Sequence, residues 1–240
     1  MMGTRSYRSF LGAVAAALLL AVTLFVLTGC GDNEPEQRKA FIAFLNENVL
    51  GKKGVSIPEL TREQEKKLGV YTEHYALLTG FQRAMRDNAR DADLLSQGTG
   101  PADLAAFAEK RSSLGKAVRE ARNLGKKTLE LRKKTDKAKS RLTSHAELTP
   151  VYDAAYTKIV ARPARLFAAM ATASHESLAA SLALLDFARS HSRDMKIENG
   201  QYVIYNTAVE PDFRALEAIE REKAREQEKA YAAFAKAMTE

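Results

Sequence analysis

The residue with the most distinctive chemistry in this chain is Cys30, the only cysteine among 240 residues. It closely follows an almost unbroken apolar stretch, residues 10–26, which is preceded by two basic residues, Arg5 and Arg8. A positively charged start, an apolar segment and small residues at its end are typical of a secretory signal peptide. The sequence therefore predicts that residues 1–29 direct the rest of the chain out of the cytoplasm.

The four residues Leu27-Thr28-Gly29-Cys30 resemble the lipobox of bacterial lipoproteins. In that family the cysteine thiol receives a diacylglyceryl group and becomes the acylated first residue after the signal peptide is removed. The resemblance implies that Cys30 is the lipidation site, that palmitate labels it, and that residues 30–35 form an acylated tether. Two or three acyl chains are needed for stable attachment, because a single chain holds a protein on a membrane only reversibly.

The competing interpretation of residues 10–26 is an uncleaved transmembrane anchor, because about 20 apolar residues are enough to span a bilayer. Both interpretations place the bulk of the chain outside the cytoplasm, since basic residues such as Arg5 and Arg8 favour the cytoplasmic side. We expect a protein held on the cell membrane by lipid and facing the periplasm. Gly31 rather than an aspartate directly follows Cys30, which favours the outer over the inner membrane by analogy with lipoprotein sorting.

Other reactive groups are sparse. Without a second cysteine, the chain has no disulfide bonds, thiolate metal sites or cysteine nucleophiles beyond Cys30. None of the four histidines has a histidine partner four residues away, the usual helical spacing for zinc ligands, so we predict no metal site. We find no Gly-x-Ser-x-Gly elbow and no complete phosphate-binding loop. We therefore expect no cofactor and no catalytic residues, and we expect that the protein is not an enzyme.

Charged residues are unevenly distributed along residues 30–240. Residues 109–142 contain thirteen basic and four acidic residues, although residues 30–240 as a whole carry a net charge of only +5. Some of the basic residues recur at spacings that place them along one side of a helix. Such a stripe attracts anionic surfaces. The stripe consists of Arg119, Arg122, Lys126, Lys133, Lys137 and Arg141.

The candidate partners of this stripe in the cell envelope are anionic lipid, lipopolysaccharide phosphates or an acidic envelope protein. Nucleic acid is the wrong partner for that location. The alternative is a solvated helix face whose charge is balanced by acidic residues on neighbouring helices.

The pattern of apolar residues predicts a mainly α fold, a bundle of long antiparallel helices with one small β-hairpin. Apolar periodicity favours helices from about Pro35 to Leu50, from Pro58 to Ser96 with an interruption at Gly69, and from Ala102 to His145. Two further helices are expected from about Thr149 to Ser190, with a kink at Pro163, and from Pro211 onward. Together with the hairpin near residues 195–205, around Asn199-Gly200, they form one domain over residues 36–240.

The lipobox, the long basic helix and the region from Leu185-Asp186-Phe187 to the hairpin at Tyr205 together resemble the YiaF-type family of uncharacterised bacterial lipoproteins. The resemblance covers nearly the full length of the chain. It implies an envelope location in a Gram-negative cell. It carries no assigned activity and no catalytic residues to this sequence.

These observations predict a lipid-anchored cell-envelope protein that acts as a binding or structural module facing the periplasm. Two alternatives stay open. One is an envelope hydrolase or transferase whose site is assembled from distant residues, which a deep polar pocket with convergent side chains would favour. The other is a sensor of a small ligand, which an apolar cavity between helices would favour.

Overall fold

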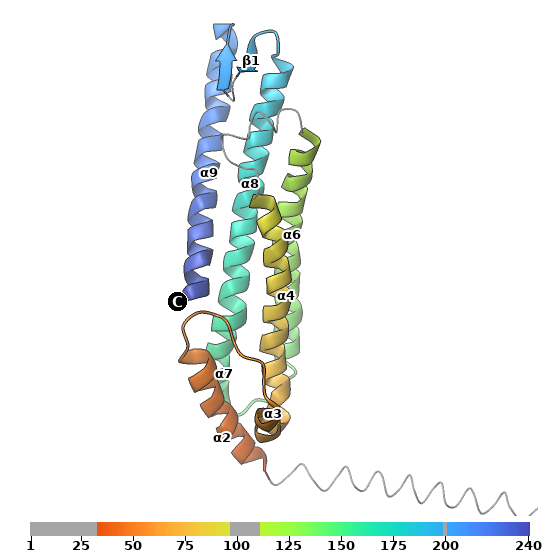
Figure 1. The fold of residues 1–240 in the computed structure, drawn as a ribbon, viewed down its shortest axis with the longest axis vertical. Coiled ribbons are helices and arrows are strands. Elements are labelled where there is room, and N and C mark those ends of the chain that lie inside the picture. Colours follow the sequence, from red (N-terminus) through yellow and green to blue (C-terminus); the bar gives the residue numbers. More distant parts are fainter. Residues whose placement is uncertain (1–32, 97–110, 199–200) are drawn as a thin grey trace, which may run out of the picture.

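Long antiparallel helices form the body of the protein. The computed structural model describes residues 33–96, 111–198 and 201–240, and only the backbone over 91–96. Within these residues, α4 (Thr72–Ser96), α6 (Arg111–Lys139), α8 (Arg162–Ser190) and α9 (Glu210–Thr239) run along the long axis in alternating directions (Figure 1). Helix α8 packs against both α6 and α9, and α4 packs against α6. The mainly α architecture expected from the sequence is thereby confirmed.

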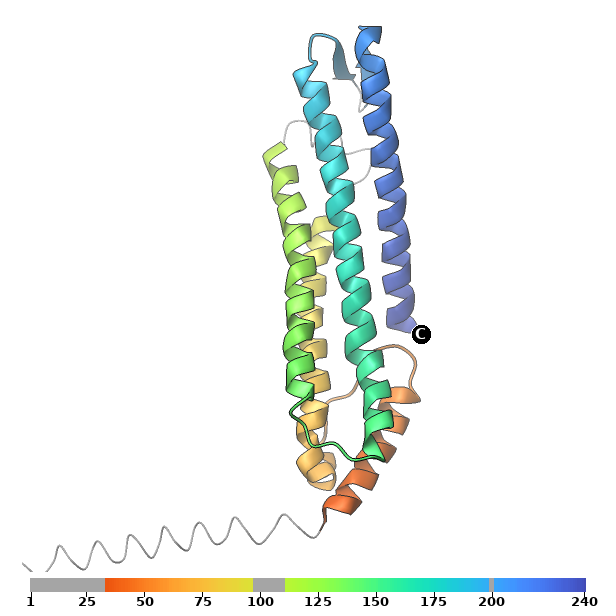
Figure 2. The same cartoon turned by 180° about the vertical axis from the view of Figure 1, so that it is seen from behind.

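Shorter helices close one end of this bundle. Helix α2 (Glu34–Leu45) continues into a π-helical turn (Asn46–Leu50), and α3 (Arg62–Leu68) leads into α4. They lie together with α7 (Leu148–Tyr156) at the end of the molecule opposite the hairpin (Figures 1 and 2). The first described residues and the connection after α6 therefore share one end of the fold.

The start of α3 differs from the sequence-based prediction. The helix begins at Arg62 instead of Pro58, because Thr61 forms a capping box: its hydroxyl accepts from the Gln64 backbone N–H, and the Gln64 side chain accepts from the Thr61 N–H. The expected interruption at Gly69 is present, with a positive φ of 53° that lets the chain turn between α3 and α4.

The long basic helix is also shorter than expected at its C-terminal end. Helix α6 ends at Lys139, and residues 140–147 form a connection of turns and irregular chain, whereas the periodicity predicted helix to His145. Ser140 and Thr143 fall where that periodicity ends, and the Ser140 hydroxyl donates to the Lys137 carbonyl, which offers the chain an alternative to a further helical turn. The first part of that predicted helix, from Ala102 to residue 110, and the gap that separates it from the helix predicted to end at Ser96 lie outside the described residues.

The helix predicted from Thr149 to Ser190 is confirmed, and its distortion lies just before Pro163. Helices α7 and α8 are joined by a π-helical turn at Thr157–Ala161, so the helical path runs without a loop from Leu148 to Ser190. Proline has no N–H and its ring collides with the preceding turn of a regular helix. The π-helical turn contains Ile159, four residues before Pro163, and both π-turns and prolines are places where helices bend.

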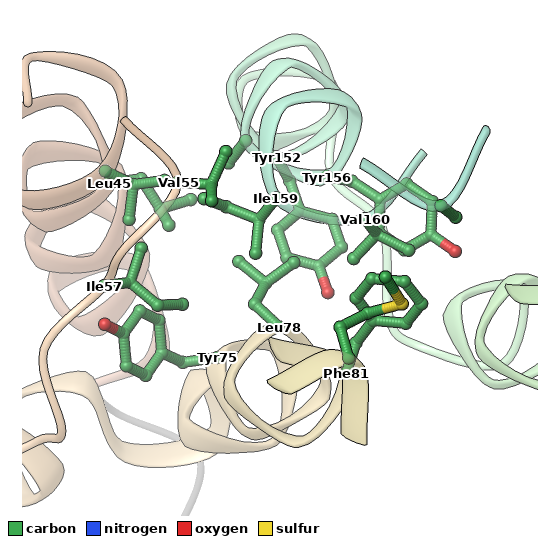
Figure 3. Close-up of a cluster of buried hydrophobic side chains, with 14 of the residues drawn as sticks. Leu45, Val55, Ile57, Tyr75, Leu78, Phe81, Tyr152, Tyr156, Ile159 and Val160 are labelled. Carbon is green, nitrogen blue, oxygen red and sulfur yellow. The ribbon is translucent and has the colours of Figure 1, made fainter. Parts of the chain in front are cut away.

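The main core lies in the half of the bundle that contains the short helices. Figure 3 shows buried side chains from α2, α4, α7 and the segment between α2 and α3 meeting in one cluster, with Tyr75, Leu78 and Tyr152 among them. Farther along, α6 and α8 approach closely through small residues: a Cβ on Gly125 would lie only 3.5 Å from the Ala171 Cβ. Ala168 and Ala171 belong to an alanine-rich stretch of α8, and these small side chains allow α6 to approach closely.

The predicted hairpin is present at the opposite end. Strand β1 (Met195–Glu198) pairs antiparallel with β2 (Gln201–Ile204), and Met195 is opposite Ile204. The predicted Asn199-Gly200 turn lies outside the described residues. Met195 is fully buried against Phe213 and α8, which explains how so short a hairpin is stable.

Candidate functional site

The basic stripe predicted from the sequence lies on the outer face of α6. All six of its side chains are exposed: Arg119, Arg122, Lys126, Lys133, Lys137 and, just after the helix ends, Arg141. At 3.6 residues per turn, the five helical members fall within a sector of roughly 60°. This sector is nearly opposite the buried side of α6, which carries Leu114, Ala121 and Thr128. We call these six residues the basic ridge.

Acidic residues do not balance the ridge. Four other basic residues of this segment are paired: Arg111 with Asp186, Lys116 with Glu120, Arg132 with Asp136, and Lys139 with Asp153. In the described ranges, no carboxylate lies within 4 Å of a charged group of the ridge. The ridge therefore presents its positive charge to the surroundings, as an anion-binding surface requires.

Sequence reasoning missed three neighbours of the ridge. Lys127 and Lys134 are exposed on the adjoining part of α6, and they too have no acidic partner among the described residues. Leu129 is 52% exposed, and it lies one helical turn from Lys126 and Lys133. Periodicity identifies a side of a helix, but only packing shows which apolar residue stays uncovered. The surface is thus basic with an apolar residue at its edge.

The chain after the ridge contacts the start of the described residues. His145 Nε2 lies 3.3 Å from Glu34 Oε1, and Glu34 also pairs with Arg38 at 3.2 Å. The Tyr71 hydroxyl donates to the same carboxylate. Burial, followed by this hydrogen bond, raises the pKa of Tyr71 to about 12. These contacts hold Glu34 beside the connection that follows α6, so the C-terminal end of the ridge and the start of the described residues lie at the same end of the fold (Figure 1).

A polar pocket of about 400 Å³ lies at the same end, between α4, the end of α6 and α7. Its polar groups are largely paired with one another. The Tyr156 hydroxyl donates to Asp136 at 2.6 Å, and Lys139 donates to Asp153 at 2.5 Å. Lys139 also lies 4.7 Å from the centre of the Tyr156 ring, a cation–π geometry. The pairing joins α6 to α7 across the connection between them.

His74 lines this pocket and is only 4% exposed, which the spacing of histidines in the sequence did not indicate. Its Nε2 lies 2.9 Å from the Thr143 carbonyl, which can only accept, so Nε2 carries the proton. Burial lowers the pKa of His74, which keeps the ring neutral. The Tyr152 hydroxyl donates to the His74 backbone carbonyl at 2.8 Å. His74 is held as a neutral donor between α4 and the connection after α6.

His175 and His191 also contact backbone carbonyls through their rings. His175 Nδ1 lies 3.0 Å from the Val118 carbonyl and links α8 to α6. Ser190 Oγ lies 3.1 Å from His191 Nδ1, but both groups also contact the Phe187 carbonyl at the end of α8. The contact between Ser190 and His191 is therefore a helix-end arrangement. Over the described ranges, no three His, Cys, Asp or Glu side chains are grouped so that they could hold a metal ion.

Cys30, the predicted lipidation site, lies outside the described residues, as do the predicted signal peptide and residues 31–32 of the predicted tether. The last two residues of that tether, Glu34 and Pro35, already belong to α2. Among the helices of residues 33–96, 111–198 and 201–240, none combines the length and apolar content needed to cross a membrane. Lipidation at Cys30 remains a prediction.

Comparison with known proteins identifies a protein family and several individual relatives. The chain matches a family described as "Protein of unknown function (DUF3053)" over residues 16–237. It is 35% identical over 161 residues to proteins described as "Uncharacterized protein YiaF" from Escherichia coli strain K12 and from Shigella flexneri. The match covers 63% of this chain and 64% of each relative, slightly less than two thirds of their length. No solved structure matches the chain.

The resemblance to the YiaF-type family that the sequence suggested is confirmed by these matches. The family match includes every helix and strand described above, from α2 almost to the end of α9. The chain therefore belongs to the DUF3053 family of proteins of unknown function.

Proposed function

We propose that the protein is a lipid-anchored component of the bacterial cell envelope, and that its helical bundle is a binding module that docks on an anionic membrane surface through the basic ridge. The observation that carries the proposal is the unbalanced charge of α6. Five exposed basic side chains share one side of α6, exposed Arg141 follows just after the helix ends, and no described carboxylate pairs with any of the six.

The energetics of a membrane surface suit this arrangement. A lysine or arginine near an anionic bilayer contributes about 1 kcal/mol, so two engaged ridge residues raise the affinity about 30-fold. A lipid anchor raises the effective concentration of the ridge at the surface, so modest contacts are enough to hold the bundle there. Neither the lipid anchor nor the basic ridge needs to bind tightly on its own.

Two observations favour lipid over an acidic protein as the partner. The partly exposed Leu129 beside Lys126 and Lys133 suits an interface where an apolar side chain enters between headgroups. The contact of His145 with Glu34 places the start of α2 at the same end of the fold as the C-terminal end of the ridge. A tether at Cys30 would leave that end of the ridge within reach of the anchoring membrane.

The test uses a form that begins at residue 31, so that the ridge acts without a lipid anchor. Reversing five ridge charges (R119E, R122E, K126E, K133E and K137E) should lower binding to vesicles that contain phosphatidylglycerol by at least about 30-fold in a sedimentation assay. Binding of the parent protein should weaken as salt is raised, because the screening length falls from about 10 Å at 0.1 M to about 3 Å at 1 M.

The matched control reverses five exposed basic residues elsewhere, with the same change in net charge: K66E, K67E, R189E, R193E and R225E. It should bind anionic vesicles at least three times more tightly than the ridge variant. Equal loss in both variants would mean that net charge alone drives binding. Absence of vesicle binding in the parent protein, with binding to purified lipopolysaccharide or to an acidic protein instead, would reject the lipid surface as the partner.

The anchor is tested separately in cells. C30S should abolish incorporation of labelled palmitate and leave an uncleaved precursor, because serine has no thiol to accept the diacylglyceryl group. Labelling that persists in C30S would refute lipidation at this residue. The ridge experiment does not depend on this result, since it uses a form without the cysteine.

A further inference from the structure

A second pocket, of about 260 Å³, lies between α4, the start of α8 and the last turns of α9. Its buried floor is apolar and consists of Val55, Met85, Ile159 and Pro163. Ile159 belongs to the π-helical turn that precedes Pro163, and such turns are frequent at functional sites. Phe234 and Ala89 form the partly buried walls.

The polar groups of this pocket are confined to its rim. Gln82 does not point a free amide into the pocket, because its Nε2 donates to the Val55 carbonyl. Ser56, Arg86 and Met238 are exposed. The lining thus changes from apolar side chains at the floor to a rim with a flexible methionine, which adapts readily to different ligand shapes.

Arg86 is the only charged residue among the described residues that line the pocket. Its neighbours on α4 are paired: Arg83 with Glu59 at 3.2 Å, and Arg90 with Asp87 at 3.9 Å. Arg86 has no carboxylate within 4 Å in the part of the chain that the structure describes. A planar guanidinium at the mouth of an apolar pocket is suited to a carboxylate or a phosphate.

We propose that this pocket binds a single-chain anionic amphiphile, with the acyl chain against the apolar floor and the anionic head group at Arg86. The pocket is larger than an apolar cavity of roughly 150 Å³ that accepts benzene. Its volume therefore favours a chain of several methylenes over a single small ring. Free fatty acids and lysophospholipids share this chemistry. The inference rests on the pocket alone and is independent of the anchor and of the basic ridge.

Isothermal titration of the residue 31–240 form with octanoate, decanoate and dodecanoate, below their micelle concentrations, tests the pocket. Each buried methylene is worth about fourfold in affinity, so each step of two should give roughly 15-fold until the pocket is full, and then a plateau. Lysophosphatidylglycerol in a parallel titration distinguishes the two sources. Binding of either head group supports the proposal and names the ligand. Failure of all four probes to bind overturns it.

Two variants with matched controls separate this site from nonspecific association. R86E should weaken decanoate binding roughly fivefold and leave decanol binding unchanged, whereas R90E on the same helix should change neither. A89L should fill the wall of the pocket and weaken both probes at least tenfold. A76L, at an exposed position of α4, should have no effect.

Thermal unfolding of each variant confirms that it folds before its binding is compared. Decanoate affinity that is equal in A89L and in the parent protein overturns the proposal, because the chain must then bind elsewhere. Decanol binding that falls as much as decanoate binding in R86E also overturns it, because Arg86 would not be recognising the head group.

Discussion

Replacing Gly125 by alanine should stabilise the protein, although Gly125 is buried where α6 meets α8. A Cβ at this position would lie 3.5 Å from the Ala171 Cβ and 3.6 Å from the Ala168 carbonyl oxygen. Both are ordinary van der Waals distances, so the methyl group fits without moving α8. Alanine is favoured over glycine inside a helix by about 1 kcal/mol. We expect G125A to raise the free energy of unfolding by about that amount.

Two further variants calibrate this expectation. At Gly80 on α4, an added Cβ meets nothing within 4 Å, so G80A reports the helix preference without packing. G125L places a branched side chain at the closest approach of α6 and α8, and overpacking of this kind costs about 1–3 kcal/mol. The order of stability should therefore be G125A close to G80A, then the parent protein, then G125L.

Urea unfolding followed by circular dichroism measures the differences. In thermal unfolding of the same variants, a change of one kcal/mol corresponds to a shift in melting temperature of about 2–4 °C for a domain of this size. If G125A is destabilised by more than about 1 kcal/mol while G80A is stabilised, then α6 and α8 are too close at Gly125 to accept a methyl group, and the reasoning is refuted. The consequence reaches the proposed function, because this seam decides which residues of α6 face outward. G125L should thus also weaken vesicle binding.

Two more predictions concern single buried or capping groups. Because burial lowers the pKa of His74 in the folded protein, the unfolded chain binds more protons below its ordinary pKa of about 6.5. The stabilising contribution of the neutral ring is present above that pH and is lost as the pH falls, by at most about 1.4 kcal/mol per pH unit. In urea unfolding at pH 7, 6 and 5, H74Q should remove the His74 contribution to the change in unfolding free energy with pH, whereas H191Q should keep it. The same pH dependence in H74Q and in the parent protein would contradict a buried, neutral His74. T61A should lower the free energy of unfolding by about 1 kcal/mol through loss of the cap on α3, and S56A, at an exposed position in the segment before it, should be neutral in the same assay. A neutral T61A would show that the capping box contributes nothing.

Much of the fold follows from local patterns in the sequence. The π-helical extension of α2, the interruption at Gly69, the path from Leu148 to Ser190 and the pairing of β1 with β2 all agree with periodicity, glycine positions and turn residues. Such features depend on neighbours a few residues apart, which the sequence displays directly. The boundaries were less predictable: Pro58 suggested a first helical turn, but the capping box of Thr61 and Gln64 competes with it and starts α3 later.

The candidate site likewise combines features that the sequence predicts with features that it does not. Residue types and spacing were enough to find the basic ridge on one side of α6. They did not show that Asp186 and Asp153, from other helices, pair with Arg111 and Lys139 and leave the ridge unbalanced. Ion pairs between helices depend on rotation and register, which no local pattern encodes. His74 is a similar case, since its burial results from α7 and the connection after α6 covering it.

By itself, the sequence determined the helical class, the hairpin, the family resemblance and the expectation of a lipid at Cys30, because each depends on composition or on short contiguous motifs. Only the tertiary structure decided which charges are paired, which histidine is buried, and that an apolar pocket with Arg86 at its rim exists. Those features are made by residues far apart in the chain. Their energies depend on distance and burial, which come into existence only when the helices pack.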